Sequence, residues 1–160
     1  MNSKKNTELN ILALRKFRLI IQSAQDHSNQ IKLKTGISGS QIWLLQEISD
    51  KPNMTVGELA REMSLKSTTI SNLLEAVESL NLVNRLKDEN DKRRVLLQIT
   101  TKGKSVLKKS PKPTKGLLPQ ILLELESSTL INLNKSLDEI ISRINNIHSD
   151  SQFKPLPFTR

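Results

Sequence analysis

The chain has 160 residues, a formal net charge of +9, a hydrophobic content of 36% and no cysteine. This length suits one domain with extensions, and the lack of cysteine excludes disulfides and thiolate metal sites. No apolar run approaches the roughly 18 residues that a membrane helix needs, and the first ten residues lack the apolar region of a signal peptide. We therefore expect a cytoplasmic protein without a membrane segment.

The positive charge is concentrated in one part of the chain. Residues 85–115 contain 11 Lys and Arg side chains against 3 acidic ones, a net charge of +8. Concentrated positive charge is typical of a surface that binds a polyanion, whereas an ordinary solvated surface mixes the two signs. The chain has only one Trp and three Phe, which argues against a base-stacking platform for single-stranded nucleic acid.

The first part of the chain predicts two helices separated by a break. Residues 8–31 have helical spacing, with one stripe traced by Leu9, Leu12, Lys16, Leu19 and Ile20 and widened by Phe17 and Ile21. The glycines of GISGS, residues 36–40, interrupt this helix, and we expect Ser40 to cap the next one. The second helix should end around Ser49–Asp50, before Lys51–Pro52.

Residues 55–80 predict two short helices joined by a turn. Thr55 and Glu58 have the spacing of a capping box at the start of the first helix. The second helix, 67–80, has a predicted buried stripe of Ile70, Leu73, Leu74, Val77 and Leu80. Its outer face begins with small uncharged side chains, namely Ser67, Thr68, Thr69, Ser71 and Asn72. Such a pair is typical of a helix-turn-helix, whose second helix reads base edges in DNA.

Residues 82–100 predict a β-hairpin directly after this motif, which would form a wing. LVNRLK (82–87) and VLLQIT (95–100) are compatible with strands, and DENDKRR between them is rich in turn-forming residues. We expect the return strand, 95–99, to be buried. The cations of the loop would then be presented on a fixed hairpin.

The C-terminal part predicts a helix, a break and a last helix. Helix resumes near Thr101, and Pro111 and Pro113 break or bend it because proline has no backbone N–H. A last helix over about 127–148 has an apolar heptad seam of Leu130, Leu133, Leu137, Ile140, Ile144 and Ile147. The tail after it contains prolines and is predicted not to be helical.

The order of these elements resembles the MarR family of bacterial transcription regulators over about residues 8–148. The strongest section is 55–103, where the helix-turn-helix is followed by Leu82–Val83–Asn84–Arg85, Asp91–Lys92–Arg93, Ile99–Thr100 and Lys102–Gly103. Family members often have Gly where Asn81 stands and Arg or Lys where Asn72 stands. Asparagine tolerates a positive φ, so the turn should survive, and Asn72 can bond adenine, so the base preference should differ from that of relatives.

The resemblance implies a mainly α fold with a small β-hairpin, in which a winged helix-turn-helix lies between N- and C-terminal dimerisation helices. The implied divisions are a dimerisation helix at 1–35, a DNA-binding domain at 36–105, and dimerisation helices with a tail at 106–160. Such a protein would bind an inverted repeat in double-stranded DNA as a homodimer, with half-sites roughly 34 Å apart. We expect a sequence-specific repressor that needs no cofactor or metal.

The resemblance also implies roles for individual residues. Those expected to contact phosphates are Lys66, Lys92, Arg93 and Arg94, with Lys102 and Lys104 nearby, while the outer face of the 67–80 helix would lie nearest the bases. Asp91 and Arg85 are expected to shape the wing, Asp91 by holding Arg93. A small aromatic or anionic effector is implied near Asp26, His27 and Trp43, although His27 and Trp43 also suit ordinary structural positions.

Two other functions remain open at this level. A nonspecific DNA-coating dimer would have the same charge and fold but no preferred site. A winged helix that binds proteins would leave the charge of residues 85–115 unexplained. An enzyme is not expected, because the sequence has no Gly-rich phosphate loop or metal-spaced cluster, and His27 and His148 lie far apart.

Overall fold

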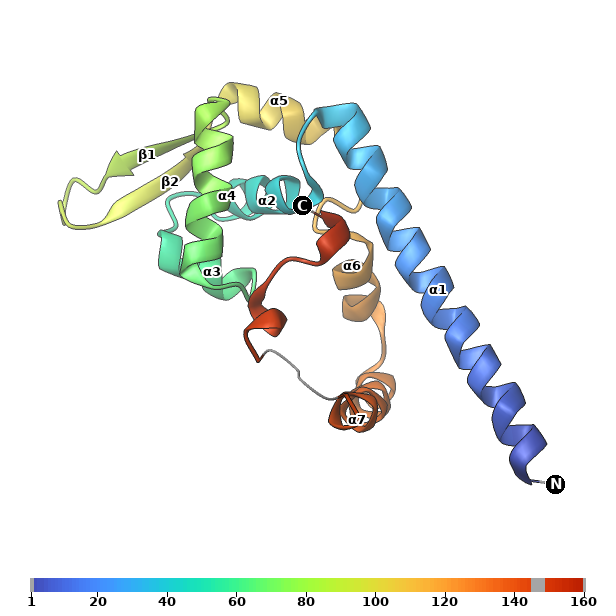
Figure 1. The fold of residues 1–160 in the computed structure, drawn as a ribbon. Helices are drawn as coiled ribbons and strands as arrows, with labels where there is room; N and C mark the ends of the chain where they lie inside the picture. The colour runs from blue at the N-terminus through green and yellow to red at the C-terminus, as the bar shows by residue number, and fades with distance from the viewer. Residues whose placement is uncertain (1, 145–148, 160) are drawn as a thin grey trace.

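The structure is a computed structural model that describes residues 2–144 and 149–159, and it is mainly helical with one β-hairpin (Figure 1). The expected fold class is therefore confirmed. The elements are α1 (Asn2–Thr35), α2 (Gly39–Asp50), α3 (Val56–Glu62), α4 (Ser67–Ser79), β1 (Val83–Lys87), β2 (Val95–Ile99), α5 (Thr101–Lys109), α6 (Leu117–Glu124), α7 (Ser127–Ser142), and the 3₁₀ turns η1 (Ser149–Phe153) and η2 (Pro157–Thr159). No helix in the described ranges has the length and apolar character needed to cross a bilayer.

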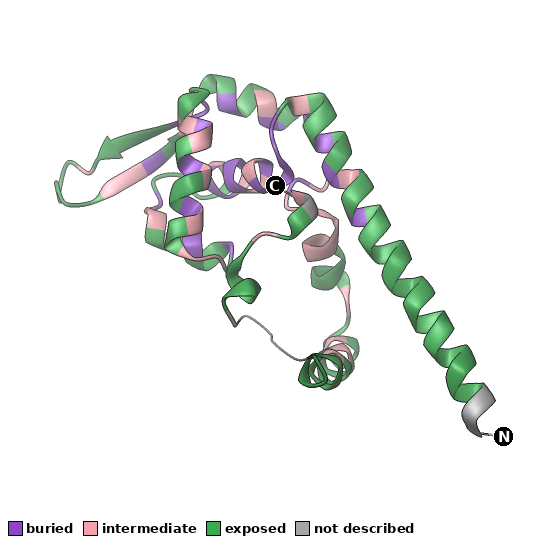
Figure 2. Cartoon of the chain, in the orientation of Figure 1, coloured by how far each residue is buried: buried purple, intermediate pink, exposed green. Residues whose placement is uncertain are grey.

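The hydrophobic core lies among α2, α3 and α4, where buried residues are concentrated (Figure 2). Helix α2 contributes Ile42, Leu44, Leu45 and Ile48, and α4 contributes Ile70, Leu74 and Val77. Leu80 was expected in the α4 stripe but is 42% exposed, because the helix ends at Ser79 and Leu80 occupies the C-cap. Burial of one side of α4 leaves its other side facing solvent.

The N-terminal cap of α2 is Ser38, and the expectation of Ser40 is wrong. The Ser38 hydroxyl accepts the backbone N–H of Gln41, and the Gln41 side chain accepts the Ser38 N–H at 2.7 Å. Ser40 lies inside the helix, where its hydroxyl donates to the Thr159 carbonyl at 2.9 Å. The capping box at Thr55 and Glu58 is confirmed at the start of α3.

Helix α1 is longer than the predicted 8–31, and its N-terminal half projects away from the core (Figures 1 and 2). Its buried residues all lie toward its C-terminal end, at Ala24, Ser28 and Ile31. The predicted apolar stripe is exposed instead, with Leu9 at 54% and Leu19 at 67%. Among the described residues of one chain, this stripe is therefore left exposed.

The C-terminal helices differ from the prediction. Helix α6 was not expected, and it accommodates Pro119 because a proline in the first turn removes an N–H that has no helical partner. The predicted helix 127–148 ends at Ser142; residues 145–148, and with them Ile147 and His148, lie outside the described residues. Helix α7 buries none of its own described residues. Tertiary packing therefore does little to stabilise a longer helix against the low helix propensity of the asparagines that follow in the sequence. The tail forms two short 3₁₀ turns where no helix was expected.

Candidate nucleic-acid interface

The exposed side of α4 carries the small polar residues that the sequence places nearest DNA bases. Ser67, Thr68, Ser71 and Asn72 are exposed, and Thr69 is half-buried. The N-cap residue of the helix, Lys66, makes no side-chain hydrogen bond to the backbone of its first turn. Free N–H groups at a helix start attract anions such as phosphate. The start of α4 therefore combines anion attraction with short side chains that let a duplex approach.

The wing is an antiparallel hairpin in which Val83 faces Ile99 and Lys87 faces Val95. Strand β2 is also held from its other side, since the Leu97 N–H donates to the Met54 carbonyl at 2.9 Å. In β2 the only fully buried described residue is Leu97, so the expectation of a wholly buried return strand is wrong. The outer part of the hairpin projects beyond the core (Figure 2).

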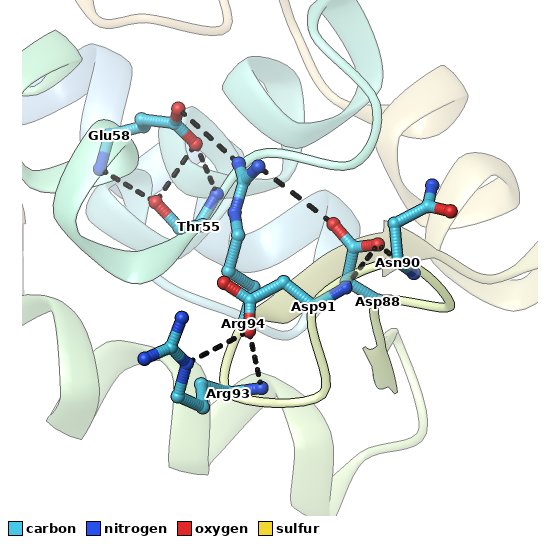
Figure 3. Close-up of polar contacts among 7 residues, drawn as sticks. All are labelled: Thr55, Glu58, Asp88, Asn90, Asp91, Arg93 and Arg94. Carbon is cyan, nitrogen blue, oxygen red and sulfur yellow. Dashed lines mark hydrogen bonds and ion pairs between the residues drawn. The ribbon is translucent and has the colours of Figure 1, made fainter.

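Two aspartates organise the loop at the tip of the wing (Figure 3). The Asp88 carboxylate accepts the Asn90 N–H at 2.9 Å, and Asp91 accepts both the backbone N–H and the Nε–H of Arg93 at 3.1 Å. These bonds from Arg93 lower the pKa of Asp91, so its carboxylate stays ionised. The contact between Asp91 and Arg93 is the one that the family resemblance implied. The Arg93 side chain remains 92% exposed, and Lys92 is exposed beside it.

Arg94 points back toward the protein instead of outward from the wing. Its guanidinium lies 3.8 Å from a carboxylate oxygen of Asp88 and 4.0 Å from one of Glu58 (Figure 3). Glu58 also accepts the Thr55 N–H at 2.7 Å in the α3 capping box, and these bonds lower the pKa of Glu58. Arg94 therefore links the wing loop to the start of α3. The Arg94 side chain is still 49% exposed, so its expected contact with phosphates stays a prediction.

The wing is fixed to α4 at its base by Arg85. The Arg85 Nε–H donates to Glu78 Oε1 at 2.7 Å, which joins β1 to the last turn of α4 and raises the pKa of Arg85. Lys102 lies at the same end of α4, where its ammonium donates to the Leu80 carbonyl at 2.8 Å. Lys102 thus caps the C-terminal end of α4, opposite the end that carries Ser67.

Thr100 and Gly103 form the joint between the wing, α4 and α5. The Thr100 hydroxyl accepts the Gly103 N–H at 2.9 Å and donates to the Asn81 carbonyl at 2.9 Å. Gly103 is packed so closely that a Cβ there would lie 2.2 Å from the Leu82 carbonyl oxygen. Asn81 adopts a positive φ of 57°, as expected for a position where relatives often have Gly. The spacing of Thr100 and Gly103 is therefore needed for α5 to pack closely against the wing and the end of α4.

Lys66, expected at a phosphate, occupies the N-cap position of α4 and is engaged by the C-terminal tail. Its ammonium lies 2.6 Å from Asp150 Oδ1. This pair lowers the pKa of Asp150. No sequence pattern indicated this contact, because the tail is remote from the helix-turn-helix along the chain.

A cavity of about 60 Å³ lies between α1, α2 and the segment that leads into α6. His27 and Trp43 line it, as expected for an effector site, together with the tail residues Leu156 and Thr159. Asp26 does not line it and is exposed on α1, where it accepts a hydrogen bond from Gln22 at 2.8 Å. The three residues expected at the effector site are thus only partly brought together.

Polar groups at this cavity are paired within the protein. The His27 Nε2–H donates to the Pro113 carbonyl at 2.9 Å. The Trp43 indole N–H donates to Glu47 Oε1 at 2.8 Å, and the Lys115 ammonium lies 2.8 Å from the same oxygen. Glu47 is only 4% exposed, and its bond raises the pKa of Lys115. The spacing of Trp43 and Glu47 on one helix face could have revealed half of this network, but Lys115 could not be placed from sequence.

Known proteins match both the helix-turn-helix and the whole fold. The model of the MarR family matches residues 37–95. YdgJ, an uncharacterised HTH-type transcriptional regulator of Bacillus subtilis, is 24% identical over 115 residues, or 72% of this chain and 70% of its own. The HTH-type transcriptional regulator MgrA of Staphylococcus aureus is 28% identical over 80 residues, or 50% of this chain, so the match spans about half (54%) of MgrA.

A solved structure extends the likeness to the flanking helices. The transcriptional regulator BldR from Sulfolobus solfataricus superposes with a TM-score of 0.54 and 25% identity, over 86% of this chain and 96% of its own. These relatives are transcription regulators, in agreement with the expectation that the chain is not an enzyme. Residues 37–95 thus match the MarR family, and the chain as a whole is similar in fold to transcriptional regulators of this type.

Proposed function

We propose that this chain represses transcription as a homodimer that binds an inverted repeat in double-stranded DNA. The observation that carries the proposal is the exposed, uncharged start of α4 beside a wing that presents Lys92 and Arg93 to solvent. A major groove admits a helix with short polar side chains, while cations on the wing neutralise phosphates. In this arrangement Ser67 and Asn72 lie nearest the bases, with their neighbours Thr68, Thr69 and Ser71.

The proposed roles of the three wing cations differ. Lys92 and Arg93 contact phosphates, because both are exposed and Arg93 is held only by its Nε–H and backbone. Arg94 positions the wing against α3 through Asp88 and Glu58. Arg85 and Asp91 shape the two ends of the hairpin.

Dimerisation is supported by the apolar surface that one chain leaves exposed. The stripe on α1 includes Phe17 at 41% and Ile21 at 50% exposure, and α7 adds Ile140 at 44%. Contiguous exposed apolar surface of this kind marks an interaction site in soluble proteins. We assign the dimer lobe to residues 1–35 and 106–160 and the DNA-binding domain to 36–105, a boundary that falls within α5.

The cavity at His27 and Trp43 is the proposed effector site, and its chemistry favours an aromatic effector over an anionic one. Lys115 is the cation at this cavity, and its charge is already balanced by Glu47 at 2.8 Å and Asp50 at 3.7 Å. A volume of about 60 Å³ is too small for a drug-sized molecule, so binding must widen the cavity. An effector that binds the widened form of the cavity more tightly than the closed form would favour the widened form, and so could change the affinity for DNA.

Selection of fragmented genomic DNA by the purified protein, followed by sequencing, tests the proposal at near-physiological salt. Recovery of one inverted repeat with half-sites about ten base pairs apart is the expected result. Recovery without a motif would instead indicate a nonspecific DNA-coating dimer. If the protein is folded and no DNA is recovered, the result would favour a winged helix that binds proteins.

A further inference from the structure

The C-terminal tail, defined here as residues 149–159, returns from the far end of the molecule to the DNA-binding domain (Figure 1). Its end is anchored at α2, where Ser40 Oγ donates to the Thr159 carbonyl at 2.9 Å and lies 3.0 Å from the Thr159 hydroxyl. Leu156 and Pro155 line the cavity between α1 and α2. The tail is therefore attached to the domain at a defined place.

The other end of the tail lies at the start of α4. Asp150 Oδ1 is 2.6 Å from the Lys66 ammonium, and the Phe153 carbonyl accepts the Lys66 N–H at 3.4 Å. Phe153 also lines a groove with Leu65 and Ser67, the residues on either side of Lys66. A carboxylate and a backbone carbonyl thus occupy the two donors of Lys66.

The ammonium and the backbone N–H of Lys66 are both groups that donate hydrogen bonds to DNA phosphates in protein–DNA complexes. A phosphate oxygen binds lysine ammonium groups and backbone N–H groups at helix starts, so at Lys66 it must compete with the acceptors that already stand there. Because Asp150 is tethered to the same chain, it competes at a high effective concentration.

We propose that the tail is a built-in competitor of DNA, with Asp150 standing in for a phosphate at Lys66. The inference rests on the proposed DNA-binding function and adds a regulatory element to it. Binding of a duplex at the start of α4 requires the Asp150–Lys66 pair to open, which lowers the affinity. Anything that removes the tail from α4 raises the affinity for DNA.

The test is duplex affinity by fluorescence anisotropy at fixed salt, using a labelled mixed-sequence duplex of about three helical turns. The full-length chain is compared with Asp150→Asn and with Asp138→Asn, a matched control that removes the same charge from an exposed position on α7. Loss of an exposed ion pair should tighten binding about two- to fivefold for Asp150→Asn beyond the control. In a Lys66→Ala background the same substitution should change affinity no more than the control does.

Each result decides between the two proposals. Equal affinities for Asp150→Asn and Asp138→Asn would overturn the competitor while DNA binding stands, and so would an Asp150→Asn effect that persists without Lys66. Duplex binding by Asp150→Asn but not by the wild type would support the competitor in its strongest form. If neither binds this duplex and the genomic selection also recovers no DNA, the proposed function itself fails, and the competitor fails with it.

Discussion

Replacing Gly103 by alanine should destabilise the protein, although alanine is the better helix former. Gly103 lies in α5, where an added Cβ would stand 2.2 Å from the Leu82 carbonyl oxygen and 2.7 Å from Ile99 Cγ1. The nearest obstacle is backbone, so it cannot rotate away as a flexible side chain would. The same Leu82 carbonyl accepts the Thr100 N–H at 3.0 Å and lies 3.2 Å from the Thr100 hydroxyl. Relief of the clash therefore strains the joint between α4, the wing and α5.

Two opposing terms set the size of the effect. In an unobstructed helix, Gly→Ala gains about 1 kcal/mol from helix propensity. Overpacking that moves backbone costs about 1–3 kcal/mol and sometimes more. The contact at 2.2 Å falls at the severe end, so we expect a net loss of about 1–2 kcal/mol in the free energy of unfolding.

Urea unfolding followed by far-UV circular dichroism measures this difference. All variants should be compared at one protein concentration, because dimerisation would make apparent stability depend on concentration. Gly57→Ala in α3 is a matched control, since nothing lies within 4 Å of its Cβ position and the propensity gain should appear unopposed. If Gly103→Ala proved as stable as Gly57→Ala, the packing argument for Gly103 would be refuted.

Three further substitutions address the interface and the caps. Arg93→Ala should weaken binding to all duplexes and reduce the slope of log affinity against log salt by about one phosphate contact, whereas Arg143→Ala, which removes another exposed arginine paired with a nearby acid, should leave the slope unchanged. Asn72→Ala should relax base preference at one or two positions of the selected site, and unchanged selectivity would remove Asn72 from the residues that read bases. Glu58→Gln should reduce the loss of stability on acidification: the lowered pKa of Glu58 means that its contribution is present above the ordinary glutamate pKa and is lost as the pH falls through the lowered pKa. Parallel acid unfolding curves for wild type and Glu58→Gln would show that this capping carboxylate does not stabilise the fold.

The sequence by itself determined the features that depend on neighbouring residues. The capping box at Thr55 and Glu58 spans a few residues, as does the contact between Asp91 and Arg93 that the family resemblance implied. The helix-turn-helix follows from patterns of the same local kind within residues 55–80. Hydrogen bonds at such short separation are set by residue type and spacing, so a pattern predicts them. Even here boundaries moved, as the shift of the α2 cap from Ser40 to Ser38 illustrates.

Only the tertiary structure decided which charges remain free for a partner. Arg93 and Arg94 are adjacent and chemically alike, yet the Arg93 side chain is 92% exposed, whereas that of Arg94 is 49% exposed and lies near Asp88 and Glu58. Lys66 meets Asp150 because the tail folds back onto the start of α4. Such pairings join parts of the chain that are remote in sequence, and they depend on where packing places whole elements, which residue spacing does not encode.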